Sequence, residues 1–411
     1  MELDPSANAL TKIFKAEYSN LVAVLCHYHG VDIQQSEDLV SDTFMQAMRV
    51  WSHKGVPDNP KAWLRKVATN KLRDLYRRKK IYDDKVRPRY LEDQESEEAP
   101  LLNEALIRDS QLRMIFAVCH TELKMESSIC LALRLLCGFN VDEIAAALLA
   151  TKASVNKKLH RAKQKLRPHK EDWDQLSEED CRQRLDPVLR IIYLIFNEGY
   201  YSSSADVEVR EEICWEALRL ALLVARQDFL PQSRTHALIA LMSFHASRLS
   251  SRTTVDGRLI LYADQDRTQW DSTLITKGNQ YLTAASTGDV ISKYHLEAAI
   301  AYWHTTEASS KWAPILQLYN KLLMVEYNPI IALNRTYALA QVKGAEAALT
   351  EAFKLDQTHN HLYHSLIAEL YIMVSKKEEA LAHLKKAMTL TNREGEKNLI
   401  TSKMEKLNEE A

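Results

Sequence analysis

The spacing of hydrophobic positions predicts helices along most of this chain of 411 residues. Over residues 8–90, apolar side chains recur every three or four positions in three separate runs. The first run begins near Leu10, the second follows Ser36, a good N-cap residue, and the third extends over residues 61–80. Glycine and proline residues around position 57 separate the last two runs. The pattern predicts a small helical bundle.

A second helical unit is predicted over residues 106–168. Its last part has a short amphipathic run ending at Leu148, a break, and a longer run from Lys152 to Arg167 for which Thr151 is a suitable N-cap. This spacing is typical of a helix-turn-helix, whose second helix enters the major groove of DNA. Residues 91–105, between the two units, are acidic and are expected to form a linker.

Helical patterns continue to the end of the chain. An apolar run that starts at Arg184 predicts a buried helix ending at Gly199. Helix pairs recur from Tyr294, and the last pair has about the 34-residue period of a tetratricopeptide repeat, although an ordinary helical packing domain gives the same pattern. We expect an all-α fold with a helical extension over residues 180–290 and tetratricopeptide-like repeats over residues 291–408.

Charge is distributed unevenly, although the net charge is only −1. The third predicted helix carries many lysines and arginines opposed only by Asp74, and residues 151–170 contain no acidic side chain. A single basic helix is often just a solvated surface or one member of a bundle. Two basic helices on either side of an acidic linker favour nucleic-acid binding. Trp63 and Tyr76 interleave with the charges of the third helix, a mixture that suits single-stranded DNA.

The cysteines and the apolar runs indicate where the protein works. All six cysteines have apolar neighbours and no C-x-x-C pair occurs, which predicts buried free thiols in a reducing compartment. The first residues lack a signal-peptide pattern, and no apolar run is long enough to span a membrane. We therefore expect a cytoplasmic protein with no membrane contact.

The segment from residue 256 to residue 271 is the one whose composition invites an enzymatic interpretation. Four carboxylates there can be imagined as a metal or acid–base cluster: Asp256, Asp264, Asp266 and Asp271. No phosphate-binding glycine loop, metal-ligand spacing or nucleophile motif accompanies them. A structural ion-pair network with Arg258 and Arg267 is the alternative interpretation. We expect no enzyme, no metal and no cofactor.

Three stretches of sequence resemble a known family. Residues 36–47 (SEDLVSDTFMQA) and 60–78 (PKAWLRKVATN through DLYRR) resemble domain 2 of extracytoplasmic-function (ECF) RNA polymerase sigma factors. Residues 139–166 resemble domain 4, with Asn156 at a position where lysine is usual. The resemblance implies a domain 2 over residues 8–90 and a domain 4 over residues 106–168. It implies a sigma factor that binds core RNA polymerase, recognises the −10 and −35 promoter elements and initiates transcription.

The resemblance also assigns roles by position, with the β′ clamp helices and the β flap of polymerase and promoter DNA as partners. The residues implied to bind core polymerase are Asp38, Leu39, Asp42, Thr43 and Phe44. The residues implied to bind the −10 element are Asp58, Asn59, Lys61, Trp63, Arg65, Lys66, Asn70, Arg73, Arg77 and Arg78. The residues implied to bind the −35 element are Thr151, Lys152, Ser154, Asn156, Lys157, His160, Arg161 and Lys163. Leu39 and Phe44 fit a core position equally well.

The remaining residues resemble the C-terminal half of one group of these sigma factors. The matching blocks include LIFNEGY at 194–200, DGRL at 256–259, DQDR at 264–267 and ALNR at 332–335. In that group the extension is held to act in place of a separate membrane anti-sigma factor, which implies regulation or the docking of a protein or peptide. Two alternatives are a helix-turn-helix regulator that works without polymerase and an enzyme housed in the extension. The motif at 38–47 counts against the first.

Overall fold

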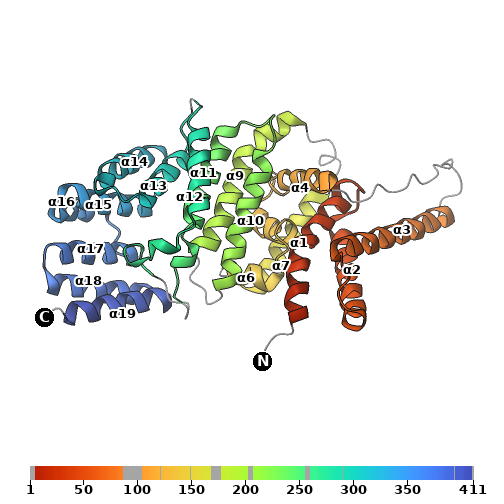
Figure 1. The fold of residues 1–411 in the computed structure, drawn as a ribbon, viewed down its shortest axis with the longest axis horizontal. Coiled ribbons are helices and arrows are strands. Elements are labelled where there is room, and N and C mark those ends of the chain that lie inside the picture. Colours follow the sequence, from red (N-terminus) through yellow and green to blue (C-terminus); the bar gives the residue numbers. More distant parts are fainter. Residues whose placement is uncertain are drawn as a thin grey trace. The chain divides into compact units, whose positions relative to one another are not determined.

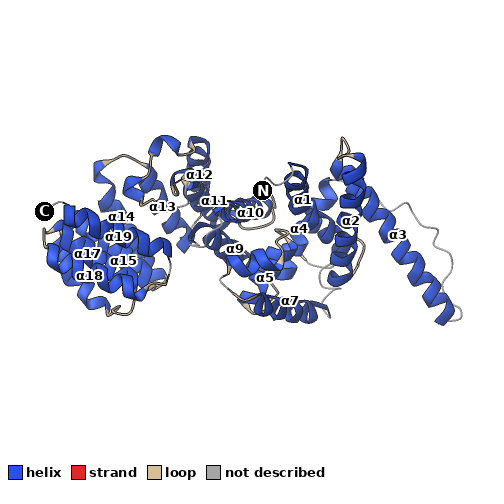
Figure 2. Cartoon of the chain, turned by 90° about the horizontal axis from the view of Figure 1, so that it is seen from below, coloured by secondary structure: helices blue, strands red, loops and turns tan. Residues whose placement is uncertain are grey.

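The computed structural model describes residues 5–86, 104–120, 122–148, 150–167, 177–201, 207–254, 260–288, 290–392 and 394–409. These residues form α-helices, short 3₁₀ turns and connecting loops, and there is no β-strand among them (Figure 2). The expected all-α fold is confirmed. The chain divides into two compact units, Met1–Glu198 and Gly199–Ala411, which are described separately.

The described residues of the N-terminal unit form eight helices, coloured red to yellow-green in Figure 1. They are α1 (Pro5–His27), α2 (Ile33–Lys54), α3 (Pro60–Val86), α4 (Glu104–Val118), α5 (Met125–Leu135), α6 (Val141–Ala147), α7 (Lys152–Leu166) and most of α9 (Glu178–Tyr201). Helix α1 packs against α2 and α3 on the one hand and against α4 and α5 on the other. The side chains of Tyr18 and Phe116 are fully buried, so the two predicted helical domains belong to one compact unit.

The first turns of α2 and α9 differ from the sequence-based prediction. Helix α2 begins at Ile33 because Asp32, whose side chain accepts a hydrogen bond from Gln34 N, is the N-cap. Ser36, expected to be the cap, is buried and accepts a hydrogen bond from Cys26 Sγ. Helix α9 begins at Glu178, after a reciprocal pair of hydrogen bonds between Ser177 and Asp180, and continues past Gly199 to Tyr201.

The helix-turn-helix is formed by α6 and α7. Asn140 and Glu143 form a capping box at the start of α6. The side chain of Thr151 accepts a hydrogen bond from Ser154 N, so the predicted N-cap of α7 is confirmed. Both helices pack on α5, and Val155, Leu159, Ala162 and Leu166 form the buried face of α7.

Glu37 of α2 joins four helices of this unit. Its carboxylate accepts a hydrogen bond from Tyr18 Oη of α1 at 2.8 Å and pairs with Arg134 of α5, whose Nε lies 2.7 Å from Glu37 Oε1. The other carboxylate oxygen pairs with the ammonium group of Lys163 on α7. The Arg134 guanidinium also lies over the Tyr18 ring, 4.9 Å from its centre. A charge only 3% exposed therefore links the predicted domain 2 to the predicted domain 4.

The ionisation of Glu37 follows from these contacts. Burial by itself would raise the pKa of this carboxyl group. The charges of Lys163 and Arg134 and the hydrogen bonds from Lys163 and Tyr18 outweigh burial, so the pKa of Glu37 is lowered. The carboxylate is therefore ionised in the folded protein at neutral pH and balances two cations.

Further polar contacts follow the same interface. Lys163 Nζ also donates to Gln34 Oε1 at 3.0 Å, and Gln111 Nε2 of α4 donates to Asn20 Oδ1 of α1 at 2.7 Å. His27 Nδ1 lies 3.1 Å from Ser110 Oγ. These contacts fix the register of the packed helices, while the apolar side chains between α1 and α4 supply most of the stabilisation.

The C-terminal unit contains the remaining helices, in green to blue (Figure 1). They are α10 (Val207–Ala225), α11 (Gln232–Ala246), α12 (Ser272–Ala285), α13 (Lys293–Thr305), α14 (Trp312–Val325), α15 (Pro329–Lys343), α16 (Ala345–Ala352), α17 (His361–Met373), α18 (Lys377–Leu390) and α19 (Glu394–Glu409). Helix α11 is buried almost all round because α10, α12 and α13 pack against it. Helices α12 and α19 lie in the regions expected to be helical, although the hydrophobic pattern did not delimit them individually.

Helices α13 to α19 pack mainly against their neighbours in the chain. One apolar cluster joins α13, α14 and α15, a second joins α15, α16 and α17, and a third joins α17, α18 and α19. The helix pairs expected from Tyr294 onward are present as α13 to α18. None of the described helices is long and apolar enough to cross a membrane. All six cysteines are free and buried, as predicted.

Replacing Glu37 with glutamine should destabilise the N-terminal unit. The substitution leaves Arg134 and Lys163 partly buried without their counter-charge, and breaking a buried pair in this way costs about 3 kcal/mol. Since the folded pKa of Glu37 lies below its unfolded value near 4.5, this stabilisation is complete above that pH and is lost as the pH falls through the folded pKa.

Thermal unfolding of wild type and Glu37→Gln, followed by circular dichroism from pH 7 to pH 3, measures this difference. Asp38→Asn, which changes an exposed acid on the same helix, is the matched control and should unfold like the wild type. Equal stability of Glu37→Gln and wild type at pH 7 would contradict the role of Glu37, as would a difference that widens toward low pH.

Candidate polymerase and DNA interfaces

Helix α2 divides the residues expected to bind polymerase into two groups. Asp38 and Asp42 are exposed and lie one helical turn apart. Leu39, Thr43 and Phe44 are buried: the Thr43 hydroxyl donates to Leu39 O at 2.8 Å, and the Phe44 ring lies 4.5 Å from that of Phe14. The buried residues fix the orientation of α2 in the bundle, so that its two carboxylates face solvent.

Two exposed methionines extend the acidic stripe of α2. Met45 is 44% exposed and Met48 is 49% exposed. Asp38, Asp42 and Met45 follow one another at spacings of four and three residues, which places them on one side of the helix. Flexible thioether side chains are common at protein-binding surfaces. Sequence reasoning missed these methionines because they fit a buried helix face equally well.

Helix α3 presents a continuous basic stripe. Lys66, Asn70, Arg73 and Arg77 are exposed and recur at helical spacing, with Arg78 exposed beside them. Arg77 Nη2 lies 3.0 Å from Asp74 Oδ1, the only acidic residue between Lys61 and Lys80. Helix α3 extends beyond the other helices of its unit (Figure 1). The stripe is therefore accessible to an extended polyanion.

Other residues expected at the −10 element have contacts within the bundle. Arg65 Nε and Lys61 Nζ each lie 3.5 Å from the fully buried carboxylate of Glu17 in α1. The Arg65 side chain is only 18% exposed, whereas that of Lys61 is 58% exposed. Glu17 therefore holds the start of α3 against α1, and Arg65 lies away from the stripe.

Residues at the start of α3 also support its position. Asn59 is exposed, and its side chain accepts a hydrogen bond from Ala62 N at 3.0 Å. The ring of Trp63 is partly buried and meets the ring of Trp51 edge to face, with centres 5.4 Å apart. Asp58 is exposed in the loop before the helix. Tyr76 is 43% exposed, and its hydroxyl donates to His29 O, which joins α3 to the end of α1.

Helix α7 exposes most of the residues expected at the −35 element. Asn156, Lys157, His160 and Arg161 are exposed on the side opposite the buried face. Thr151 and Ser154 lie at its first turn, where Thr151 caps the helix. Lys152 Nζ pairs with Asp142 Oδ1 of α6 at 2.8 Å.

Lys163, also expected at the −35 element, is less exposed than the other lysines and the arginine of α7 in that set. Its side chain is only 20% exposed because it pairs with Glu37. Lys158, which directly follows the exposed Lys157, pairs with Glu126 Oε2 of α5 at 2.7 Å. This hydrogen bond raises the pKa of Lys158. The cations of α7 thus serve two purposes: some hold the helix against α2 and α5, and others remain at the surface.

The aspartates that suggested a metal or acid–base cluster have structural contacts. Asp266 caps the 3₁₀ turn η4 (Arg267–Gln269), and Asp271 accepts hydrogen bonds from Thr273 N and Leu274 N at the start of α12. Asp256 and Arg258 lie outside the described residues. Among the residues that the structure describes, no three histidine, cysteine or acidic side chains are grouped as metal ligands.

Comparison with known proteins agrees with this arrangement. Three families match the chain: Sigma-70 region 2 over residues 14–81, Sigma-70 region 4 over residues 113–166, and a family of unknown function, DUF6596, over residues 184–286. An uncharacterized protein, R00370, of Rhizobium meliloti (strain 1021) is 30% identical over 394 residues, which cover 94% of this chain and 92% of that protein. No solved structure matches the chain. The chain belongs to the ECF-type sigma factors of the sigma-70 family that carry a DUF6596 extension, and it serves in promoter recognition and transcription initiation.

Proposed function

We propose that the exposed stripe of α2 is the surface by which this sigma factor binds the β′ clamp helices of core polymerase. The observation that carries the proposal is the division within α2: Asp38 and Asp42 face solvent, while Leu39 and Phe44 anchor the helix. Met45 supplies apolar contact beside the carboxylates. Domain 4 is assigned the β flap by the family resemblance alone.

Helix α3 reads the −10 element in this proposal. Lys66, Arg73 and Arg77 neutralise phosphates of the melted strand, and Asn70 lies between them. Trp63, supported edge-on by Trp51, offers a ring beside the loop that takes an unstacked base. Asp58 and Asn59 belong to that loop, and Lys61 and Arg65 orient the helix through Glu17.

Helix α7 reads the −35 element through its exposed side. Asn156 suits base edges in the major groove. Ser154 lies two residues before it, in the first turn of the helix. Lys157 and Arg161 set the phosphate register, together with Lys152 and His160. No step in this account requires bond chemistry by the protein or a cofactor.

The contacts of Lys163 on α7 with Glu37 and Gln34 on α2 indicate a closed form that is not bound to a promoter. The −35 and −10 elements are about 25 base pairs apart, or about 85 Å along a straight duplex at 3.4 Å per pair. A compact unit of about 200 residues has a radius of gyration of only about 16 Å. Helix α7 therefore has to leave Glu37 and Gln34 before both DNA-reading helices reach their elements on one promoter. Lys163 is freed for DNA in the same step.

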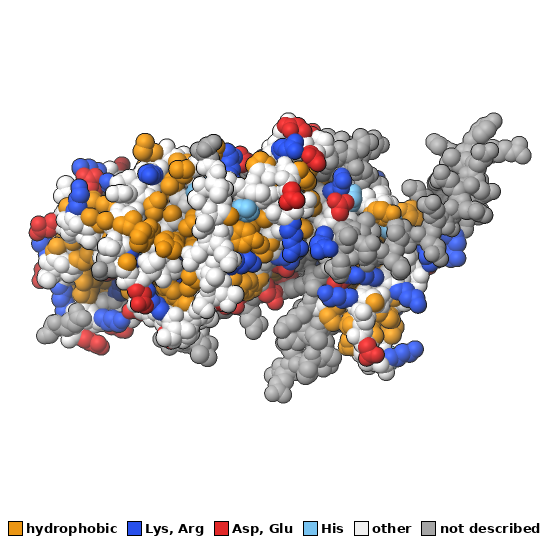
Figure 3. All heavy atoms as spheres, turned by 45° about the horizontal axis from the view of Figure 1, so that its top comes forward, with side chains coloured by type: hydrophobic (Ala, Val, Ile, Leu, Met, Phe, Trp, Pro, Cys, Tyr) orange, Lys and Arg blue, Asp and Glu red, His pale blue; other side chains and the backbone are white. Residues whose placement is uncertain are grey.

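The extension is proposed to regulate this opening or to dock a protein or peptide partner. Hydrophobic side chains are exposed over the C-terminal unit (Figure 3). Met324 is 87% exposed and Tyr327 is 67% exposed at the turn between α14 and α15, with Val325 and Ile330 beside them. Exposed apolar residues grouped at one turn are typical of an interaction surface. Stacked helix pairs of the tetratricopeptide type use such surfaces for peptides.

Changing both Asp38 and Asp42 to alanine should weaken binding to core polymerase at least about tenfold. Each lost charged contact costs about 1.5–3 kcal/mol, and neither carboxylate is buried in the fold. Affinity for purified core polymerase, measured by fluorescence anisotropy, tests this expectation. Glu178→Ala with Glu179→Ala removes the same charge from exposed acids of α9 and is the control. Equal affinities for the two double variants would exclude the α2 stripe as the polymerase surface.

Asn156→Ala and Lys157→Ala should affect −35 binding in different ways. Loss of a base-edge contact relaxes the preference at one base pair, at a cost of about 1–3 kcal/mol. Loss of a phosphate contact weakens all sequences alike and reduces the salt slope by about one. Binding of holoenzyme to a randomised promoter library at several salt concentrations separates the two effects. A uniform loss with Asn156→Ala together with a changed preference with Lys157→Ala would reverse these assignments.

A further inference from the structure

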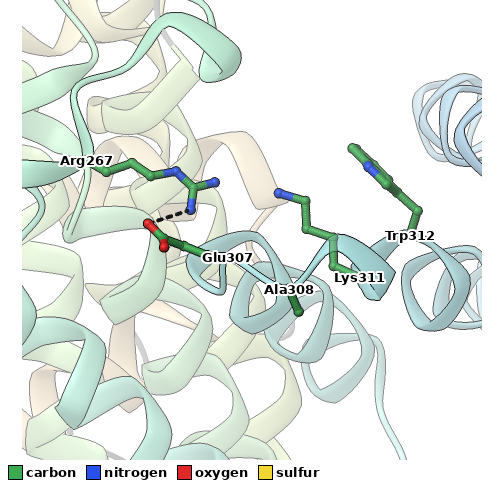
Figure 4. A pocket seen from close by; sticks show the side chains of 5 residues that line it. All are labelled: Arg267, Glu307, Ala308, Lys311 and Trp312. Atoms are coloured by element: carbon green, nitrogen blue, oxygen red, sulfur yellow. Dashed lines mark ion pairs between the residues drawn. The ribbon is translucent and has the colours of Figure 1, made fainter.

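A cationic pocket lies in the C-terminal unit, where the sequence motif DQDR at 264–267 meets the start of α14. It is an open cavity of about 370 Å³ lined by Arg267, Glu307, Ala308, Lys311 and Trp312. Arg267 and Lys311 extend toward each other from opposite sides, and Glu307 approaches Arg267 from below (Figure 4). Neither polymerase binding nor DNA reading uses these residues.

Tyr262 holds the two cations of the pocket in place. Arg267 Nη2 donates to Tyr262 Oη at 3.0 Å, and Lys311 Nζ donates to the same oxygen at 3.3 Å. Tyr262 Oη in turn donates to His304 O at 2.6 Å. A neutral phenol therefore holds two cationic side chains side by side, and it supplies no negative charge to offset their repulsion.

A third cation, Arg248, lies near the same aromatic rings. The Arg248 guanidinium is 5.3 Å from the centre of the Tyr262 ring and 5.7 Å from that of the Trp270 ring. Arg267 also lies over Trp270, at 4.9 Å, and Lys311 over Trp312, at 5.6 Å. The aromatic faces attract the cations weakly, so they help to position them but leave their charge uncancelled.

Negative charge beside these cations is scarce in the part of the chain that the structure describes. The nearest paired carboxylate is Glu307 Oε1, 3.8 Å from Arg267 Nη1, and its side chain is 85% exposed. Within the described residues, Lys311 and Arg248 have no carboxylate within ion-pair distance. Such a solvated pair is weak, so a net positive charge remains at the pocket.

His304 reflects the same excess of positive charge. Burial and the charges of Arg248, Lys311 and Arg267 lower the pKa of His304 to about 3, so its ring is neutral at physiological pH. Its Nδ1 atom is buried with no hydrogen-bond partner among the described residues, and so is Trp270 Nε1. Buried polar atoms of this kind are usually satisfied by a ligand or an ordered water.

We propose that this cationic pocket binds a small phosphate-bearing anion between Arg267 and Lys311. An arginine fork and a lysine point charge together suit the oxygens of a phosphate group. The cavity is large enough for a small organic phosphate, and the Trp312 ring forms one wall against which a planar group packs. The C-terminal unit then contains a ligand-binding site, to which the DUF6596 match contributes Arg267, and occupancy of this site is available as a signal to the sigma domains.

Isothermal titration of the full-length chain with inorganic phosphate and with adenosine monophosphate, in a phosphate-free buffer, tests the proposal. Both should bind, the nucleotide more tightly because of Trp312. Arg267→Gln combined with Lys311→Gln should weaken both by at least about tenfold, since two charge-assisted contacts are lost. Lys385→Gln with Lys386→Gln, which removes two exposed cations from α18, should leave the affinity unchanged.

Glu307→Gln gives a test that a folding defect cannot imitate. The side chain is 85% exposed, so its loss should not unfold the protein, and removal of its negative charge should tighten phosphate binding severalfold. Absence of binding by the wild type would overturn the proposal, as would an affinity that is unchanged by Arg267→Gln with Lys311→Gln. Equal affinities for phosphate and the nucleotide would overturn the role given to Trp312. These readouts are independent of polymerase and promoter binding.

Discussion

The buried carboxylate of Glu37 is the constraint on which the arrangement of the N-terminal unit depends. It accepts a hydrogen bond from Tyr18 of α1 and forms ion pairs with Arg134 of α5 and Lys163 of α7. A charge at this position needs its partners, because an uncompensated carboxylate in a protein interior is costly. The two sigma regions therefore meet through the apolar packing of α1 on α4 and through this polar contact, whose strength depends on complete pairing.

The lysine and arginine side chains of the N-terminal unit form two groups, one partly buried between helices and one exposed. Buried or half-buried cations such as Arg65, Arg134 and Lys163 hold helices together through Glu17 and Glu37. Exposed cations on α3 and α7 remain for phosphates. In the structure Lys163 belongs to the first group, and in the proposed opening it joins the second when α7 leaves α2. The proposal thus links promoter binding to separation of the two regions through this exchange of partners.

Local sequence signals predicted most of the fold. Hydrophobic spacing placed the helices, and Thr151 was correctly identified as the N-cap of α7 because capping depends on adjacent residues. Ser36 was misassigned because Asp32 offers an equally good cap four residues earlier. The hydrophobic pattern left Leu39 and Phe44 open between core and surface, and only packing against α1 decided that both are buried. Contacts between residues far apart in the chain, such as Glu37 with Lys163 and Tyr262 with Lys311, have no local signal.

In vitro transcription with purified core polymerase on fragmented genomic DNA, with and without this protein, tests the sigma function most directly. Sequencing of the transcript 5′ ends should reveal start sites that depend on the added protein and share one pair of −35 and −10 elements. A genome-wide template removes the need to know the promoter in advance. An unchanged set of start sites, together with no binding of the protein to core polymerase, would contradict the account.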